Sequence, residues 1–125
     1  MAKVLVVEDN ETNMELATAL IIASGHTAVQ AWTAEEAIQK ARTDKPALIL
    51  MDISLPGMDG LTATGLLKQD PETQHIPVLA LTAHAMKGDE ARAIEAGCVG
   101  YLIKPIDTRA FPKELERYLG IDGKV

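Results

Sequence analysis

The sequence predicts an α/β fold in which a mostly parallel, five-stranded sheet is covered on both faces by helices. Short β-branched runs alternate with segments of helical periodicity, and this alternation occurs five times along the 125 residues. No linker, internal repeat or low-complexity stretch interrupts the series. Apolar residues make up 47% of the chain, which is enough for one hydrophobic core. These observations together predict a single doubly wound domain.

The predicted strands are short, and the central ones are apolar throughout. Continuous apolar runs such as 48–51 and 78–81 are typical of strands that are buried on both faces of a parallel sheet. The run 27–31 has the weakest pattern of the five. The predicted strands are Lys3–Val7, Thr27–Ala31, Leu48–Met51, Val78–Leu81 and Val99–Ile103.

Apolar positions at helical spacing predict a helix after each strand, and glycine or proline marks where most of these helices end. Thr33 and Glu36 form a capping box at the start of the second helix. The predicted helices are Asn13–Ser24, Thr33 to about Thr43, Leu61–Gln69, Lys87–Ala96 and a last helix ending near Leu119. We expect buried faces formed by Leu16, Ala19, Leu20 and Ala23 in the first helix and by Ala37, Ile38 and Ala41 in the second.

The last helix has a proline close to its predicted start. Asp107 or Thr108 could cap a helix here, but Pro112 would then lie in the first or second turn. Proline fits a helix only where the missing N–H would be unpaired in any case. We therefore expect a helix that begins late, near Pro112, or one that is kinked there.

The charge balance excludes several classes of partner. Twelve Lys and Arg against 18 Asp and Glu give a net charge of −6 and a pI near 5.0, so neither nucleic acid nor an anionic membrane is expected as a partner. The lone Cys98 cannot form an intramolecular disulfide and suits a reducing compartment. The sequence shows no targeting segment or bilayer span, so we expect a cytoplasmic protein.

Polar and charged residues follow four of the predicted strands. Glu8 and Asp9 follow the first, Asp52 the third, Thr82 the fourth and Lys104 the fifth. Because the carboxyl ends of parallel strands lie at one edge of the sheet, these side chains are expected to converge on one crevice. Two carboxylates about 4 Å apart repel by about 4 kcal/mol at an effective dielectric near 20. A divalent cation with oxygen ligands, Mg²⁺, would offset this repulsion, and Lys104 adds a second positive charge.

The combined motifs resemble the receiver domain of bacterial two-component response regulators. The resemblance extends over residues 3–119 with the order and spacing of the motifs intact, and it implies a flavodoxin-like fold with strand order 2-1-3-4-5. The segment 80–90 is most similar to receivers of hybrid sensor kinases and of stand-alone cell-cycle regulators. The motifs are Glu8-Asp9, Leu-Ile-Leu-Met-Asp-Ile-Ser-Leu-Pro-Gly-Met-Asp-Gly around Asp52, Leu-Thr-Ala ending at Ala83, and Tyr101-Leu-Ile-Lys-Pro.

The resemblance implies a role for each residue of the crevice. Asp52 would accept a phosphoryl group from a phosphohistidine, and Lys104 would bind the phosphoryl oxygens. Mg²⁺ would be bound directly by Asp9, Asp52 and the backbone carbonyl of Ser54, with Glu8 acting mainly through a metal-bound water. The physical argument agrees, because phosphoryl transfer depends mostly on positioning and charge neutralisation.

The resemblance also implies a conformational switch. The Thr82 hydroxyl would bond the phosphoryl group and Tyr101 would turn inward, which would alter the face formed by the fourth helix, the fifth strand and the fifth helix. Ser54 and His84 lie two residues beyond Asp52 and Thr82 and are expected to tune the lifetime of the aspartyl phosphate.

Two other functions share parts of this pattern. A haloacid-dehalogenase-like Mg²⁺-dependent phosphatase also uses a strand-end Asp and a lysine, but it would need a second Asp where Ser54 stands. A flavodoxin-like cofactor binder would need a phosphate-binding loop after the first strand, where the acidic run 8–11 stands.

The preferred interpretation is one receiver domain over residues 1–125 without an output domain. Such a protein catalyses only its own phosphorylation and dephosphorylation. The expected partners are a sensor histidine kinase or a histidine phosphotransfer protein, together with a downstream protein target. The protein is expected to be a monomer or a phosphorylation-dependent dimer.

Overall fold

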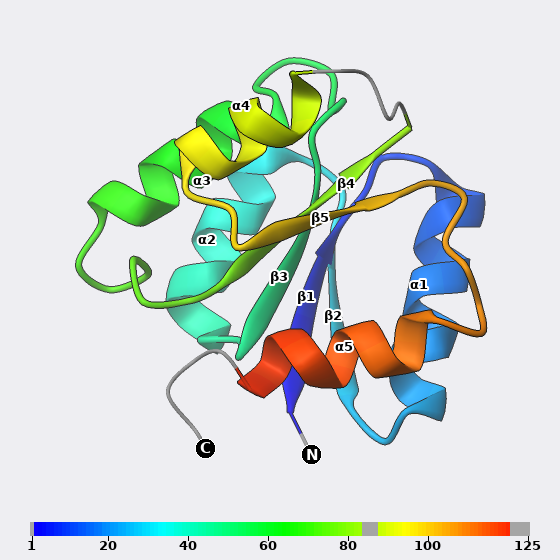
Figure 1. The fold of residues 1–125 in the computed structure, drawn as a ribbon. Coiled ribbons are helices and arrows are strands. Elements are labelled where there is room, and N and C mark those ends of the chain that lie inside the picture. The colour runs from blue at the N-terminus through cyan, green and yellow to red at the C-terminus, as the bar shows by residue number, and fades with distance from the viewer. Residues whose placement is uncertain (1, 84–87, 121–125) are drawn as a thin grey trace.

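The structure is a computed structural model that describes residues 2–83 and 88–120 (Figure 1). Its strands form one parallel sheet in the order β2-β1-β3-β4-β5. This order confirms the predicted fold, and each strand begins and ends within one residue of the predicted bounds. The strands are β1 (Lys3–Val7), β2 (Thr27–Ala31), β3 (Leu48–Asp52), β4 (Val78–Thr82) and β5 (Gly100–Ile103).

Helices cover both faces of this sheet. Figure 1 shows α1 and α5 on one face and α2, α3 and α4 on the other. Among the described residues, none of the helices combines the length and the apolar composition that a membrane-spanning helix needs. The helices are α1 (Glu11–Ala23), α2 (Ala34–Asp44), α3 (Gly60–Gln69), α4 (Asp89–Ala96) and α5 (Phe111–Leu119).

The core consists of two apolar clusters, one on each face of the sheet. Successive strand residues point to opposite faces, so Val4 and Val6 belong to one cluster while Leu5 and Val7 belong to the other. The helices contribute Met14, Ala17, Ile21, Phe111, Leu115 and Tyr118 to the first cluster and Ala34, Ala37, Ala41, Ala63, Leu67 and Ala93 to the second.

The predicted buried face of α1 is only partly correct: Leu16 and Leu20 are half-buried, and Leu20 packs against the first cluster. The buried residues are Met14, Ala17 and Ile21, whereas Ala19 and Ala23 are exposed. The helix is apolar over most of its circumference, and even Ile22 is 60% exposed. Apolar spacing therefore did not identify the side that faces the sheet. The helix also begins earlier than predicted because the side chain of its N-cap, Asn10, accepts a hydrogen bond from the Asn13 N–H at 2.9 Å.

The capping signal of α2 is present in a modified form. Thr33 Oγ1 accepts a hydrogen bond from the Glu36 N–H at 3.1 Å, as expected for an N-cap. Glu36 Oε1 accepts a hydrogen bond from the Trp32 N–H at 2.7 Å, one residue before the position that a capping box uses. Ala37 is buried as predicted, but Ile38 is only half-buried.

The late start predicted for the last helix is correct. The helix α5 begins at Phe111, so Pro112 lies in its first turn, where a missing N–H costs no intrahelical bond. Asp107 Oδ1 accepts hydrogen bonds from the N–H groups of Arg109 and Ala110, which organises the turn before the helix. The predicted start of α4, Lys87, lies outside the described residues.

Candidate functional site

Two carboxylates and one ammonium group meet at the carboxyl edge of the sheet. Lys104 Nζ lies 2.9 Å from Asp52 Oδ2 and 2.9 Å from Glu8 Oε1. Both carboxylate side chains are 2% exposed, and the Lys104 side chain is 14% exposed. The strand order explains this meeting: β3 lies between β1 and β4, and β5 is the next strand. Residues from segments 52 positions apart are thus brought within hydrogen-bond distance.

Asp9 completes an acidic cluster that could hold a cation. One carboxylate oxygen from each of Glu8, Asp9 and Asp52 lies within 4.8 Å of the other two. Asp9 is exposed, while the other two are buried, so the cluster opens to solvent on one side. Hard oxygen ligands with room for retained waters are the environment that Mg²⁺ prefers. The donor set therefore fits Mg²⁺.

The loop after β3 is organised around the Asp52 carboxylate. The Ser54 N–H donates a hydrogen bond to Asp52 Oδ1 at 2.9 Å, which places the Ser54 backbone beside the acidic cluster. The Asn10 N–H donates in the same manner to Glu8 Oε2 at 3.2 Å. Backbone donors thus help to hold two of the three carboxylates in fixed orientations.

Burial and mutual repulsion make the acidic cluster electrostatically unfavourable. Burial raises the pKa of Glu8 above its usual value of 4.5, and neighbouring Asp52 raises this pKa further, with Lys104 opposing the shift. Burial alone would lower the pKa of Lys104, but its hydrogen bonds with Glu8 and Asp52 outweigh that effect and raise it. Lys104 consequently stays charged, and the excess of negative charge favours a further cation at this edge.

The residues predicted to form the switch lie next to this cluster and on the neighbouring strand. Thr82 is 3% exposed at the end of β4, and its carbonyl accepts a hydrogen bond from the Lys104 N–H at 2.7 Å. Tyr101 in β5 is half-buried against the apolar cluster beneath α2, α3 and α4. His84 lies outside the described residues.

The close contact that Gly60 makes with the site could not be predicted from the sequence. Gly60 is the first residue of α3, and a Cβ atom placed on it would lie 2.9 Å from the Asp52 carbonyl carbon. In the sequence, Gly60 follows Pro56, Gly57 and Asp59, a pattern that indicates only a turn before a helix. A contact between two backbone segments leaves no recognisable pattern in a single sequence.

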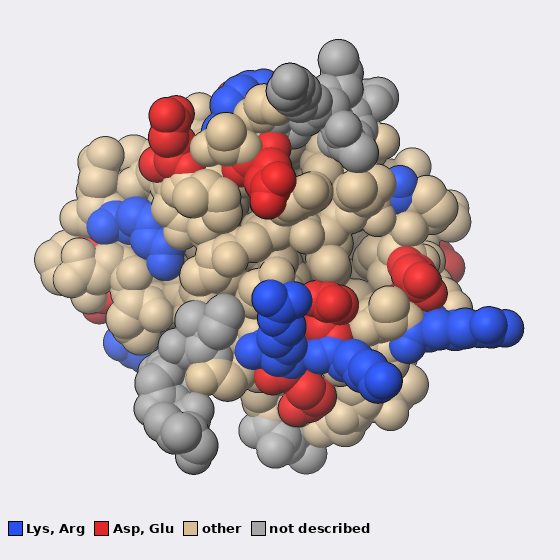
Figure 2. Space-filling view, in the orientation of Figure 1, with Lys and Arg blue, Asp and Glu red and all other residues tan. Residues whose placement is uncertain are grey.

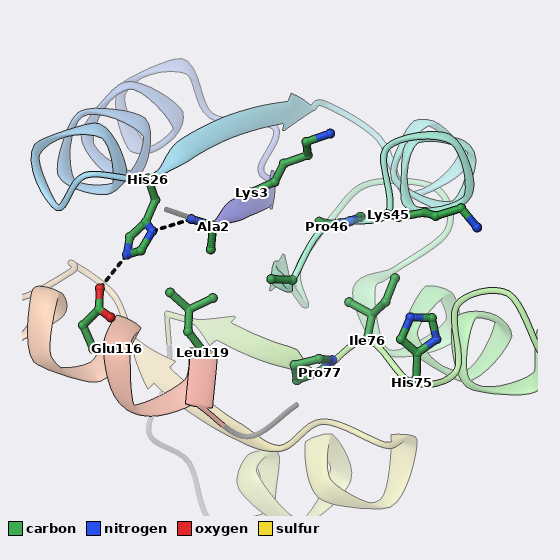
Figure 3. Close-up of a pocket in the computed structure, with 11 residues that line it drawn as sticks. Ala2, Lys3, His26, Lys45, Pro46, His75, Ile76, Pro77, Glu116 and Leu119 are labelled. Carbon is green, nitrogen blue, oxygen red and sulfur yellow. Dashed lines mark hydrogen bonds and ion pairs between the residues drawn. The ribbon is translucent and has the colours of Figure 1, made fainter. Parts of the chain in front are cut away.

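A separate hollow of about 550 Å³ lies at the opposite edge of the sheet (Figure 3). His26 spans one side of it, accepting a hydrogen bond at Nδ1 from the Ala2 N–H at 2.9 Å and contacting Glu116 Oε2 through Nε2 at 2.5 Å. Lys3 Nζ donates a hydrogen bond to the Asp44 carbonyl at 3.1 Å, and the Lys45 side chain points out of the hollow in Figure 3. The polar groups around this hollow therefore do not converge as those at the carboxyl edge do.

Comparisons with known proteins agree with this geometry. Residues 4–116 match the family model of the response regulator receiver domain. The chain is 50% identical over 117 residues to the polar-differentiation response regulator DivK of Brucella anthropi, a match that covers 94% of this chain and 95% of that protein. DivK of Brucella ovis shows the same identity and coverage.

Solved receiver structures have the same fold. The receiver domain of a sensor histidine kinase from Pseudomonas aeruginosa PAO1 has a magnesium ion coordinated in its active site cleft; it aligns with a TM-score of 0.87 and 31% identity over 95% of this chain and 98% of its own. The chemotaxis response regulator CheY4 of Vibrio cholerae aligns with a TM-score of 0.88 and 25% identity over 94% of this chain and 98% of its own. None of these matches supports the phosphatase alternative. The length of the family match and the half-identical relatives show that the chain belongs to the response regulator receiver family.

Proposed function

We propose that Asp52 accepts a phosphoryl group from the phosphohistidine of a sensor histidine kinase or a histidine phosphotransfer protein, and that the phosphorylated domain then regulates a protein target. The observation that carries this proposal is the meeting of three carboxylates with Lys104 at one edge of the sheet. The receiver family supplies the class of partner, and DivK, a response regulator, supports the signalling role.

The chemistry requires one bond to form and one to break. An Asp52 carboxylate oxygen attacks the phosphorus, and the bond between phosphorus and the donor imidazole nitrogen breaks. The electron pair of that bond stays on the imidazole, which takes up a proton from its surroundings. Lys104 Nζ lies 2.9 Å from Asp52 Oδ2, and this contact supports a role in which Lys104 binds an oxygen of the transferred group and offsets its charge.

Mg²⁺ has a defined set of candidate ligands in this chain. Asp9, Asp52 and the backbone carbonyl of Ser54 would hold the ion, and Glu8 would contribute through a bound water. When bound, Mg²⁺ neutralises negative charge that would otherwise oppose the approach of a phosphoryl group. The solvent-exposed position of Asp9 and the raised pKa of Glu8 both support a cation in this cluster.

Thr82 and Tyr101 are the proposed switch residues, and the output surface is formed by α4, β5 and α5. Two large apolar side chains are exposed there, Ile94 on α4 at 50% and Ile103 on β5 at 44%. A hollow of about 380 Å³ separates β5 from α5, and Tyr101 lines it. Figure 2 shows uncharged surface over β5, between the charged side chains of α4 and α5. An apolar surface with a charged rim suits a protein partner.

Residues 1–125 are proposed to act as one receiver domain whose output is a change in protein binding. The match to DivK covers 94% of this chain and 95% of the length of that protein, which supports a receiver domain that extends over most of residues 1–125. Ser54, beside the Asp52 carboxylate, and His84 are proposed to influence how long the phosphoryl group remains on Asp52.

The proposal can be tested with a small acyl phosphate as the phosphoryl donor. The protein is incubated with the donor and Mg²⁺, and intact mass spectrometry is used to detect one added phosphoryl group that base removes. Asp52→Asn should give no adduct. Asp59→Asn is the matched control, because Asp59 lies in the same loop and Asn also serves as an N-cap. An adduct that persists in Asp52→Asn, or none in the wild type, contradicts the proposal.

A further inference from the structure

The first residue of α3 packs on the backbone that follows β3. A Cβ atom on Gly60 would lie 2.8 Å from the Cα of Ile53 and 2.9 Å from the carbonyl carbon of Asp52, and closer still to the Asp52 carbonyl oxygen. A Cβ atom in a protein essentially never lies less than 3.0 Å from a heavy atom outside its own residue and its chain neighbours. Any side chain at Gly60 therefore forces either the Asp52–Ile53 peptide or the start of α3 to move.

The start of α3 is firmly anchored. Asp59 Oδ1 accepts a hydrogen bond from the Thr62 N–H at 2.8 Å, and the buried Thr64 hydroxyl donates to the Gly60 carbonyl at 2.8 Å. Leu67, further along the same helix, is 1% exposed in the core. Moving this helix to make room for a side chain would break its cap or its packing, so the neighbouring loop is expected to absorb part of the displacement.

The backbone that Gly60 contacts carries groups of the proposed phosphoryl-transfer site. The Ile53 N–H donates a hydrogen bond to the Leu81 carbonyl at 3.1 Å, which joins this peptide to β4. The next residue, Ser54, donates its N–H to Asp52 Oδ1 at 2.9 Å. A displacement of the Asp52–Ile53 peptide therefore changes the position of Ser54 relative to the Asp52 carboxylate.

We propose that Gly60 is a positioning residue of the phosphoryl-transfer site. Its lack of a side chain lets α3 pack on the Asp52–Ile53 peptide, and this contact fixes the Ser54 backbone beside the Asp52 carboxylate. The inference rests on the proposed function, because it treats the Ser54 carbonyl as a Mg²⁺ ligand. Among the described glycines, Gly60 alone would bring its Cβ closest to backbone atoms. The three atoms nearest to a Cβ at Gly97 or at Gly100 belong to a side chain, and a Cβ at any other described glycine would have no atom within 4 Å.

Gly65→Ala provides a matched control for Gly60→Ala. Both glycines lie in α3, but a Cβ at Gly65 would meet no atom within 4 Å. Mg²⁺ affinity is measured by calorimetry on the unphosphorylated protein, and the Ser54 amide is followed by NMR without metal. In Gly60→Ala the Ser54 signal should shift and Mg²⁺ affinity should fall on the order of tenfold. Phosphorylation by an acyl phosphate should slow on the order of 100-fold, while Gly65→Ala matches the wild type in all three measurements.

Several outcomes would overturn the inference. One is a Gly60→Ala protein whose Mg²⁺ affinity and Ser54 amide signal equal those of the wild type. Another is a Gly60→Ala protein that does not fold, even when Gly65→Ala is added to favour the helix, because the contact would then support the fold rather than the site. If the wild type takes up no phosphoryl group although Gly60→Ala weakens Mg²⁺ binding and shifts Ser54, the proposed function fails and the positioning role stands.

Discussion

Replacing Lys104 with methionine should destabilise the protein in a way that depends on pH. Lys104→Met keeps most of the side-chain length but removes the only cation within 4.0 Å of the buried carboxylates Glu8 and Asp52 among the described residues. Each 2.9 Å contact corresponds to a gross attraction of about 6 kcal/mol at an effective dielectric of about 20, most of which desolvation cancels. Losing one partner of a buried ion pair lowers the free energy of unfolding by about 3–5 kcal/mol. Because this site opens to solvent, we expect Lys104→Met to lower the free energy of unfolding by about 3 kcal/mol near pH 7.

The pKa of Glu8 determines the sign of the pH dependence. Burial already raises this pKa above 4.5, and removing Lys104, which opposes that shift, raises it further. When folding raises the pKa of a carboxyl group, its protonated form stabilises the folded state. This stabilisation is complete below the pKa of the group in the unfolded chain, 4.5, and is lost as the pH rises through its pKa in the folded protein. The destabilisation by Lys104→Met should therefore be largest near pH 7 and should decrease as the pH is lowered toward 4.5.

Urea unfolding at these two pH values, with and without Mg²⁺, measures the effect. Mg²⁺ should stabilise Lys104→Met more than the wild type, because the ion replaces part of the missing positive charge. Lys113→Met, at an exposed position of α5, is the control and should change stability by less than about 0.5 kcal/mol. If Lys104→Met loses the same amount of stability at both pH values, and Mg²⁺ does not change that loss, the electrostatic explanation is wrong.

Three further predictions concern the switch, the core and a helix cap. Thr82→Ala should accept the phosphoryl group but show no phosphorylation-dependent gain in partner affinity in a pull-down; a normal gain would show that the switch assignment is wrong. Leu115 is fully buried, so Leu115→Ala should lower the free energy of unfolding in urea by about 2–5 kcal/mol. Ile22 is 60% exposed, so Ile22→Ala should lower it far less. Thr33→Ala should cost about 1 kcal/mol by removing the N-cap of α2, and an unchanged urea midpoint would contradict the capping role.

The alternation of strands and helices was sufficient to predict the order and type of every element. Strand-end positions also predicted which side chains would meet, because the carboxyl ends of parallel strands share an edge whatever the details of packing. Glu8, Asp52 and Lys104 lie together for this reason. The start of α5 could likewise be located, since Pro112 is compatible with few positions in a helix.

Other features depend on packing that one sequence does not encode in a readable form. The buried side of α1 could not be identified because apolar residues surround most of the helix, leaving Ile22 exposed and Met14 buried. The contact between His26 and Glu116 joins residues 90 positions apart. The approach of Gly60 to Asp52 involves backbone atoms, which every residue type shares.

Chemical trapping can locate the phosphoryl group on the chain and so test whether Asp52 is the acceptor. Phosphorylated protein is reduced with borohydride, which converts an aspartyl phosphate to homoserine, and the peptides are then sequenced by mass spectrometry. We expect homoserine at position 52 when the donor and Mg²⁺ are both present, with Asp9 and Asp59 unmodified. Homoserine at another aspartate, or its absence from position 52, would show that Asp52 is not the phosphoryl acceptor.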